Sequence, residues 1–366
     1  MTDELRRAFD DVEPLTVGLE EEVVLLDHDT LDLLPIASDV VDGGDPRIKL
    51  ELPATQVELI SAPHRSVPGA IAEIAEIRRA LVALAGDRAR PAALAVHPFA
   101  AAEGTLNGGE RYAALAAEYG PVSRRQLVCA LQVHVAVGDA DTTLAVYNEL
   151  RGHLPEIAAL AAAAPFHAGR DTNLASIRPQ LAELLPRQGM PPIIESWDAL
   201  GEELRWGAVS GFVSEPGNWW WELRPHVVHG TLEIRVPDVQ PALADGAAIA
   251  AVGHAVVAWL SARARAGDLR PPVSTWRIEQ NRWSALRHGV EGNMAELRSG
   301  RLRTTRECLA DLLDAIEPFA LDLGCADQIT HARRLVEANG AIRLRRAGDP
   351  HAATAWAAQQ FLAHED

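Results

Sequence analysis

The stretch that decides the fold is VGLEEEVVLLD, residues Val17–Asp27. Aliphatic and β-branched residues fill it and a polar break follows, which predicts a β-strand. Because successive side chains of a strand point to opposite faces, Glu20 and Glu22 share one face and Glu21 points to the other. Three adjacent carboxylates in an apolar strand repel one another, so the stretch also predicts a cation nearby.

Four further strands are predicted to repeat this alternation. They lie at Thr55–Ala62, at Leu127–Val137 and in two halves of Trp219–Val236, which meet around Val228-His229-Gly230. In each strand, polar or charged residues occupy every second position and therefore share one face. These residues are Gln56 and Glu58, then Gln132 and His134, then Glu222, Arg224 and His226, and finally Glu233 and Arg235.

Helices are predicted between and after these strands. Pro68 opens a helix with apolar residues at spacings of three and four, and residues 142–164 are helical with a break or second start at Pro155. Gly169–Ile194 is predicted to be a long functional loop with short helical pieces. The chain is mostly helical from Pro241, and Asp349-Pro350 begins the last helix. Strands and helices without regular βαβ alternation predict an α+β fold, with residues 1–366 as a single domain.

Composition narrows the classes of function. The 366-residue chain has a formal net charge of −17, so it lacks the basic surface of a protein that binds nucleic acid polymers. Cys129, Cys308 and Cys325 form no metal or redox motif. The polar N-terminus is unlike a secretory signal, and Ala242–Leu260 is interrupted by charge, which favours a buried helix over a membrane span. We therefore expect a cytoplasmic protein with no membrane partner.

The shared face of the five strands has two interpretations. One is the solvated face of an antiparallel sheet, which alternation alone would produce. However, such a face normally carries Thr, Ser, Lys and Arg, whereas this one carries Glu, Gln, His and Arg. Converging carboxylates suit Mg²⁺ or Mn²⁺, and a neighbouring arginine suits a phosphate or carboxylate. Taken together, the strands favour a metal–nucleotide site.

Motifs that would indicate other kinds of site are absent or incomplete. No GxGxxG, GxxxxGK[ST] or GxSxG sequence is present, which argues against Rossmann, P-loop and nucleophile-elbow sites. His226 and His229 form an HxxH pair, but zinc would need further ligands at short spacing. Asn281 lies in a helical segment, as either a surface residue or a phosphate contact. Arg170 and Arg178 lie in the long loop, as either solvated side chains or part of an anion site.

Six motifs, in this order, resemble the type 2 glutamate–cysteine ligases, a family of carboxylate–amine ligases. They span about 270 residues: GLEEE (Gly18–Glu22), QVELISAP (Gln56–Pro63), QVHVAVGD (Gln132–Asp139), PFHAGRDTNLASIRPQ (Pro165–Gln180), RPHVVHGTLEIRVPD (Arg224–Asp238) and NRWSALRHG (Asn281–Gly289). The resemblance implies a glutamine synthetase-like fold, in which a bent antiparallel sheet forms an active-site funnel backed by helices. It also implies that ATP converts a carboxylate to an acyl phosphate, which an amine attacks to form an amide, with release of ADP and phosphate.

The resemblance assigns roles to particular residues. The metal ligands for Mg²⁺ or Mn²⁺ would be Glu20, Glu22, Glu58, His134 and Glu233. Arg235 would stabilise the transferring phosphoryl group beside Glu233. Arg170 and Arg178 would hold the carboxylate substrate or a phosphate, and Arg224 and Asn281 would support the nucleotide.

The chain departs from the family pattern at three places. Gln132 stands where relatives tend to have histidine, the 170–178 loop lacks both tyrosines of the usual GRDTGYASYR, and Pro237 replaces a frequent cysteine. The departures concern substrate specificity more than ATP chemistry. Two alternatives stay open: a guanidino-kinase-like phosphotransferase and a non-catalytic nucleotide or amino-acid binding protein. The expected partners are small amino-acid and amine substrates, with a homodimer left open.

Overall fold

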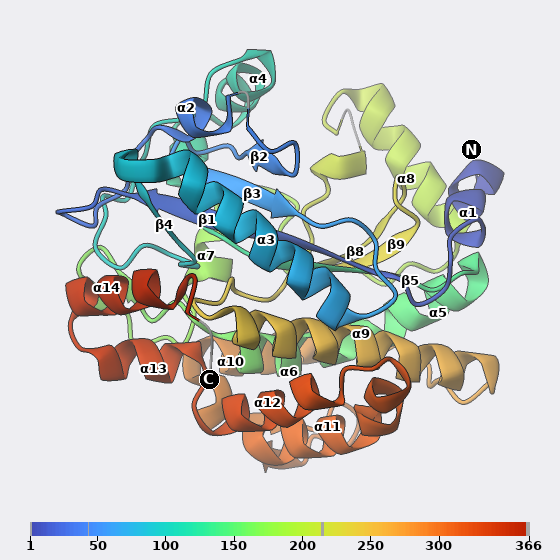
Figure 1. Ribbon diagram of the computed structural model, residues 1–366. Helices are drawn as coiled ribbons and strands as arrows, with labels where there is room; N and C mark the ends of the chain where they lie inside the picture. The colour runs from blue at the N-terminus through green and yellow to red at the C-terminus, as the bar shows by residue number, and fades with distance from the viewer. Residues whose placement is uncertain (1, 43, 214–215, 364–366) are drawn as a thin grey trace.

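The computed structural model describes residues 2–42, 44–213 and 216–363. Within these ranges, seven strands form an antiparallel sheet in the order β2-β3-β1-β5-β9-β8, with β4 beside β1 (Figure 1). The strands are β1 (Val17–Leu26), β2 (Ile48–Leu50), β3 (Gln56–Ile60), β4 (Arg90–Ala92), β5 (Leu131–Ala136), β8 (Leu223–His226) and β9 (Thr231–Ile234).

Helices α3 (Val67–Ala85) and α9 (Leu243–Arg265) cover one face of this sheet (Figure 1). Helix α3 begins where Ser66 accepts a hydrogen bond from the backbone NH of Gly69, and Pro68 occupies its first turn. Helix α9 packs closely at Gly253, where an added Cβ would lie 3.2 Å from Ile234 on β9. The apolar side of the sheet is thereby buried, and the opposite side is left for polar residues.

The remaining helices surround this core. Helices α11 and α12 pack on α9, away from the sheet. Two small two-stranded sheets, β6–β7 and β10–β11, lie outside the main sheet. The bounds of the other elements are α1 (Thr2–Asp10), α2 (Ala37–Val41), α4 (Glu110–Tyr119), α5 (Ala140–Leu150), α6 (Leu154–Ala161), β6 (Phe166–His167), β7 (Arg170–Asp171), α7 (Arg178–Ala182), α8 (Trp197–Ser210), α10 (Thr275–His288), β10 (Asn293–Ala295), β11 (Leu302–Thr304), α11 (Thr305–Asp322), α12 (Ala326–Glu337), α13 (Gly340–Ala347) and α14 (Pro350–Gln360).

Most of the predicted elements are confirmed. The five strands and the helix at Pro68 are present, and Pro155 lies in the first turn of a second helix, α6. Asp349 caps α14 by accepting a hydrogen bond from the NH of Ala352. The differences are local: β5 begins only at Leu131, and the β10–β11 hairpin interrupts the helical C-terminal part, where short strands lack a long alternating pattern.

The long apolar helix α9 is buried inside the protein. It has the length and hydropathy of a membrane span, yet most of its residues are covered by the sheet and by α11 and α12. The predicted buried helix is confirmed. An apolar helix surrounded by protein contributes to the core and presents no continuous lipid-facing surface.

Glu21, the middle glutamate of the stretch Glu20–Glu22, lies on the face of the sheet that the helices cover. Glu21 forms a bidentate ion pair with Arg78 of α3, with N···O distances of 2.7 and 2.6 Å, and both side chains are buried. Arg78 also donates to the backbone carbonyls of Gln240, Pro241 and Phe361. This pair ties α3 and the C-terminal segment to β1, so the carboxylate of Glu21 is structural.

Candidate active site

The strand register collects the predicted polar residues on the open face of the sheet. Glu22 lies opposite Glu58 on β3, and Glu20 lies opposite Gln132 on β5. On the other side of β5, His134 lies opposite Glu233. Directly opposite residues of an antiparallel pair share a face, so these side chains converge from four strands.

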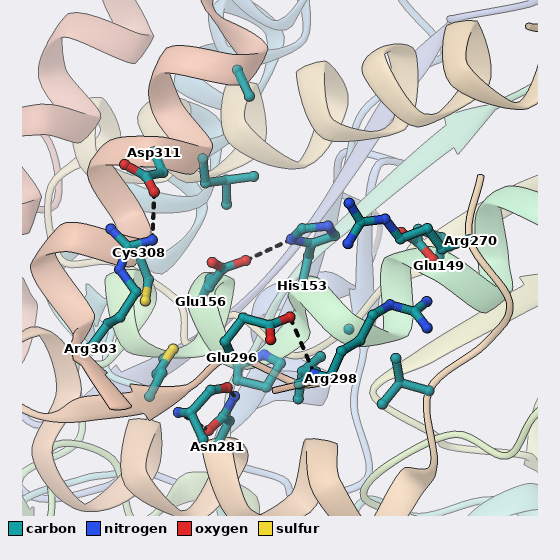
Figure 2. A pocket seen from close by; sticks show the side chains of 18 of the residues that line it. Glu149, His153, Glu156, Arg270, Asn281, Glu296, Arg298, Arg303, Cys308 and Asp311 are labelled. Carbon is teal, nitrogen blue, oxygen red and sulfur yellow. Dashed lines mark hydrogen bonds and ion pairs between the residues drawn. The ribbon is translucent and has the colours of Figure 1, made fainter. Parts of the chain in front are cut away.

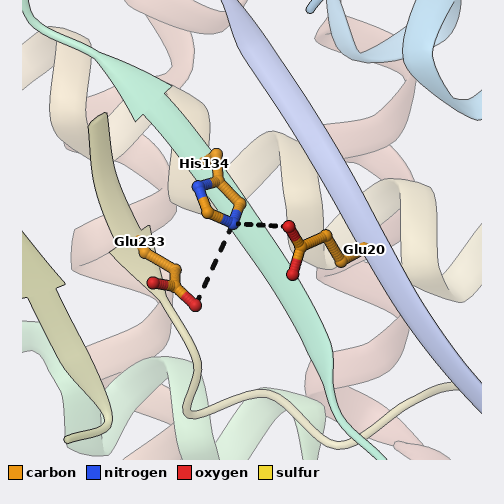
Figure 3. A group of neighbouring side chains, drawn as sticks. All are labelled: Glu20, His134 and Glu233. Carbon is orange, nitrogen blue, oxygen red and sulfur yellow. Dashed lines mark ion pairs between the residues drawn. The ribbon is translucent and has the colours of Figure 1, made fainter. Parts of the chain in front are cut away.

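The first group consists of Glu20, His134 and Glu233 (Figure 3). His134 Nε2 lies 3.3 Å from Glu20 Oε1 and 4.0 Å from Glu233 Oε1. His134 Nδ1 is held by the hydroxyl of Thr231, 3.0 Å away, which orients the ring. Although Nε2 is buried, it makes no hydrogen bond of good geometry. This nitrogen is therefore available to a metal ion held between the two carboxylates.

Two arginines compensate the charge of this group. Arg224 and Arg235 both form ion pairs with the fully buried Glu233. Burial by itself would raise the pKa of Glu233, but Arg235, His134 and Arg224 lower that pKa far below its ordinary value. Burial likewise opposes the charged form of His134, yet Glu20 and Glu233 raise its pKa. The group is therefore strongly ionised in the folded chain.

The second group consists of Glu22, Glu51 and Glu58, whose carboxylate oxygens lie within 4.8 Å of one another. Burial raises the pKa of all three, that of Glu51 to about 8, and neighbouring carboxylates add to the rise for Glu51 and Glu58. Within the described residues, none of the three forms an ion pair with an arginine, lysine or histidine. A cation bound among them would therefore stabilise their charged forms.

Gln132 links the two groups. Its Nε2 donates to Glu22 Oε1 at 2.9 Å, and its Oε1 accepts a hydrogen bond from Arg235 Nη1. The same Nη1 contacts Glu233, so one guanidinium spans from Gln132 to the first group. Sequence reasoning placed Gln132 on the polar face and noted it as a departure from the family pattern, whereas the structure makes it the bridge between the two carboxylate groups.

The donors fit a divalent cation that prefers oxygen. Five carboxylates and one imidazole form two adjacent groups, and the trio without a protein cation has raised pKa values. Mg²⁺ and Mn²⁺ accept this ligand set, whereas tetrahedral zinc sites favour sulfur and nitrogen ligands. The predicted metal ligands Glu20, Glu22, Glu58, His134 and Glu233 all belong to these groups.

Glu51 is a further candidate ligand that the sequence analysis missed. It follows directly after β2, a strand of three residues at the edge of the sheet. A strand this short shows no alternation, so the sequence carries no reliable sign of which way Glu51 points. The only available signal was its place between the first two strands of the polar face.

Other predicted site residues lie outside the two groups. Arg178 is buried and holds the chain after β9: its Nε donates to Asp238 at 2.6 Å and its Nη2 to the carbonyl of Val236 at 2.5 Å. Arg170 is exposed on the small β6–β7 hairpin. Asn281 bonds the backbone of Ala295 through both amide atoms, each at 2.8 Å, and lines a separate cavity. Their roles in substrate or nucleotide binding stay predictions.

His226 and His229, the HxxH pair, lie at the turn between β8 and β9. The rings of His226 and His229 stack 4.3 Å apart, and both lie within 6 Å of the His134 ring. Burial lowers the pKa of His226 to about 4, so its ring is neutral near pH 7. The turn between β8 and β9 requires Gly230, whose φ is +65° and whose added Cβ would lie 1.9 Å from the Ala8 carbonyl oxygen.

Comparison with known proteins adds to this geometry. The family described as glutamate–cysteine ligase family 2 matches residues 16–357. A relative from Rubrobacter xylanophilus is 33% identical over 91% of this chain and 92% of its own length, and one from Salinispora arenicola is 32% identical over 96% and 95%. Both are named "Putative glutamate--cysteine ligase".

Two solved structures share the fold at low sequence identity. The glutamate–cysteine ligase of Francisella tularensis, solved in complex with AMP, has a TM-score of 0.70 at 13% identity and covers 96% of this chain and 89% of its own. A bifunctional glutathione synthetase from Pasteurella multocida has a TM-score of 0.64 at 16% identity, covering 98% of this chain and 53% of its own. The predicted α+β fold, an antiparallel sheet backed by helices, is thus confirmed.

Proposed function

The chain belongs to glutamate–cysteine ligase family 2, a family of carboxylate–amine ligases, and we propose that it activates an amino-acid carboxylate with ATP and joins it to a small amine. The carboxylate is that of glutamate or a related amino acid, and the amine is cysteine or another small amine. Enzymes of this family use ATP. ADP and phosphate are the expected co-products, because the carboxylate becomes an acyl phosphate before the amine displaces phosphate.

The observation that carries the proposal is the pair of adjacent carboxylate groups with Arg235 between them. Glu20, His134 and Glu233 lie on one side, and Glu22, Glu51 and Glu58 on the other. In phosphoryl transfer, catalysis consists mainly of positioning and of compensating the negative charge of phosphate oxygens. Mg²⁺ or Mn²⁺ held by these two groups would neutralise phosphate oxygens and so permit ATP to approach an acidic face.

Arg235 is the proposed catalytic arginine. Its Nη1 is committed to Gln132 and Glu233, while its Nε and Nη2 make no hydrogen bond among the described residues. Three N–H bonds, one on Nε and two on Nη2, are therefore left for oxygens of the transferring phosphoryl group. Because Glu233 fixes the guanidinium in advance, little reorganisation is needed when charge develops on that group.

Arg224 is proposed to support the nucleotide side indirectly. Its guanidinium pairs with Glu233 and donates to the backbone carbonyls of Gly217 at 2.7 Å and Trp219 at 3.0 Å. It thereby fixes the segment before β8 against the sheet. Arg170, Arg178 and Asn281 complete the proposed substrate and nucleotide contacts.

The deciding experiment measures ADP, free phosphate and amide product with ATP, Mg²⁺ and panels of amino acids and amines. We expect one acid–amine pair to stimulate stoichiometric release of ADP and phosphate together with an amide. Folded protein that binds Mg²⁺ but shows no stimulated turnover with any pair would contradict the ligase and favour the non-catalytic binding protein. A phosphorylated acceptor without free phosphate would instead identify the guanidino-kinase-like alternative.

A further inference from the structure

A cavity lies among the helices, apart from the two carboxylate groups of the sheet. Its volume is about 480 Å³, and it is lined by residues of α5, α6, α9, α10, α11 and the β10–β11 hairpin. No residue of the two carboxylate groups lines this cavity. The volume is in the range that holds small-molecule ligands.

The cavity carries the ion pair between His153 and Glu156 (Figure 2), and an aromatic ring lies beside it. His153 Nδ1 lies 2.6 Å from Glu156 Oε2, and the ring of His153 meets Trp259 edge to face at 5.5 Å. Burial opposes protonation of His153, but Glu156 and Glu149 raise its pKa. Glu156 Oε1 and His153 Nε2 make no hydrogen bond within the described residues, so each can contact a ligand.

Two arginines of the cavity have few partners, and its two glutamates keep free oxygens. Arg270 forms no hydrogen bond or ion pair in the described part of the chain, and the side chain of Arg298 uses only Nη2, on the carbonyl of Pro271. Glu149 makes one long ion pair with Arg263, 3.9 Å away, and Glu156 pairs with His153 through one oxygen only. By contrast, Arg303 is paired with Asp311 at 2.6 Å.

We propose that this cavity is a binding site for a small zwitterion, with Arg270 and Arg298 receiving its carboxylate and Glu149 and Glu156 its ammonium group. Trp259 and Met294 supply the apolar wall against which the carbon chain packs. A ligand with only one kind of charge would cover the groups of the opposite sign without giving them a further partner. The cavity shares only Asn281 with the residues proposed for the ligase, and no part of the present proposal uses Asn281.

Cys308 provides a readout confined to this cavity. Its half-buried thiol lines the cavity, whereas Cys129 and Cys325 are fully buried. Burial raises the pKa of Cys308, so alkaline pH is needed for its reaction with a thiol reagent such as an aromatic disulfide. A ligand at ten times its dissociation constant should slow the reaction about 11-fold, because only the unoccupied cavity reacts.

The test uses the full chain without ATP and a series of ω-amino acids from β-alanine to 6-aminohexanoate at up to ~10 mM. Matching carboxylic acids and alkylamines test the requirement for both charges. We expect at least one amino acid to protect Cys308, its single-charge analogues to protect it far less, and Arg270→Ala/Arg298→Ala to abolish protection. Arg301→Ala, an exposed arginine of the same hairpin outside the cavity, should leave protection unchanged.

Three outcomes would overturn the proposal. They are no protection by any member of the series, equal protection by the single-charge analogues, and retained protection in the folded double variant. Mass spectrometry must place the modification on Cys308, and Cys308→Ser must abolish the signal. Failure here would leave the ligase proposal intact, because no step of the test measures ATP turnover.

Discussion

Gln132 donates a hydrogen bond from Nε2 to Glu22 Oε1 over 2.9 Å, and this contact connects the two carboxylate groups of the site. The other end of the same amide accepts from Arg235. An amide is suited to this position because it offers a donor to a carboxylate and an acceptor to a guanidinium at once. Gln132 therefore positions Arg235 relative to the proposed metal ligands.

Replacing Gln132 should lower the turnover number without changing the KM for the amino acid. In Gln132→Leu, both hydrogen bonds to charged partners are lost, and we expect kcat to fall about 10- to 100-fold through misplacement of Arg235. The KM for the amino acid should change little. Steady-state kinetics under saturating Mg²⁺ measure both quantities.

Gln56→Leu is the matched control for this prediction. Gln56 is equally buried on strand β3 of the same sheet, but its Nε2 has no hydrogen-bond partner among the described residues. We expect wild-type kcat for this variant. If Gln56→Leu lowers kcat as much as Gln132→Leu, the effect belongs to packing of the sheet and the positioning role is wrong.

Glu20 and Glu21 are neighbours in sequence, but their substitutions should have opposite consequences. Glu20→Gln removes a proposed metal ligand, and we expect turnover to fall at least about 10³-fold with little change in the unfolding free energy. Glu21→Gln leaves Arg78 buried without its partner and should lower the free energy of unfolding by about 3–5 kcal/mol.

Denaturant unfolding and ATP turnover, measured on both variants, distinguish the two roles. Circular dichroism of each variant establishes that it is folded under assay conditions. Full turnover in Glu20→Gln would remove this residue from the proposed metal site. Unchanged stability in Glu21→Gln would show that the ion pair with Arg78 does not hold α3 on the sheet.

The pKa of Glu51, raised to about 8, gives the metal-free protein a pH dependence of known sign. Between the ordinary pKa of about 4.3 and pH 8, the folded carboxyl binds more protons than the unfolded one. The unfolding free energy of the metal-free protein should therefore fall as pH rises through this window. Mg²⁺ favours the charged carboxylates and should restore more stability at pH 8 than at pH 6.

Thermal unfolding at the two pH values, with and without Mg²⁺, measures this effect. Glu51→Gln removes the titrating group and should flatten the pH dependence. Glu110→Gln changes an exposed carboxylate on α4 and serves as the control of equal charge. A Mg²⁺ effect that is as large at pH 6 as at pH 8 would show that metal binding is not linked to these protons.

Arg235→Lys tests the need for a guanidinium. Lysine keeps the positive charge beside Glu233 but cannot contact Gln132, Glu233 and a phosphoryl oxygen together. We expect kcat to fall about 10²- to 10³-fold while the KM for ATP changes little, since the contact forms with the transferring group. A large rise in KM with unchanged kcat would assign Arg235 to ground-state binding instead.

The sequence predicted which side chains share the polar face of the sheet, because the direction of a side chain in a strand depends only on its position along that strand. The alternation around Glu20, Glu22, Gln132, His134 and Glu233 determines which side chains share a face, whatever the rest of the chain does. The antiparallel register then brings them together as expected. Motif order extended the prediction to the family and the fold, and the comparisons confirmed both.

Contacts between distant segments depended on the tertiary structure. The cation that compensates Glu21 comes from Arg78, 57 residues later, and no local pattern indicates that pairing. Glu51 joins the site because a short edge strand turns it toward Glu22 and Glu58, and Asn281 lies at the cavity among the helices because its helix packs against β10. Periodicity along one element therefore determined which face each residue occupies, whereas the packing of elements far apart in the chain decided which faces meet.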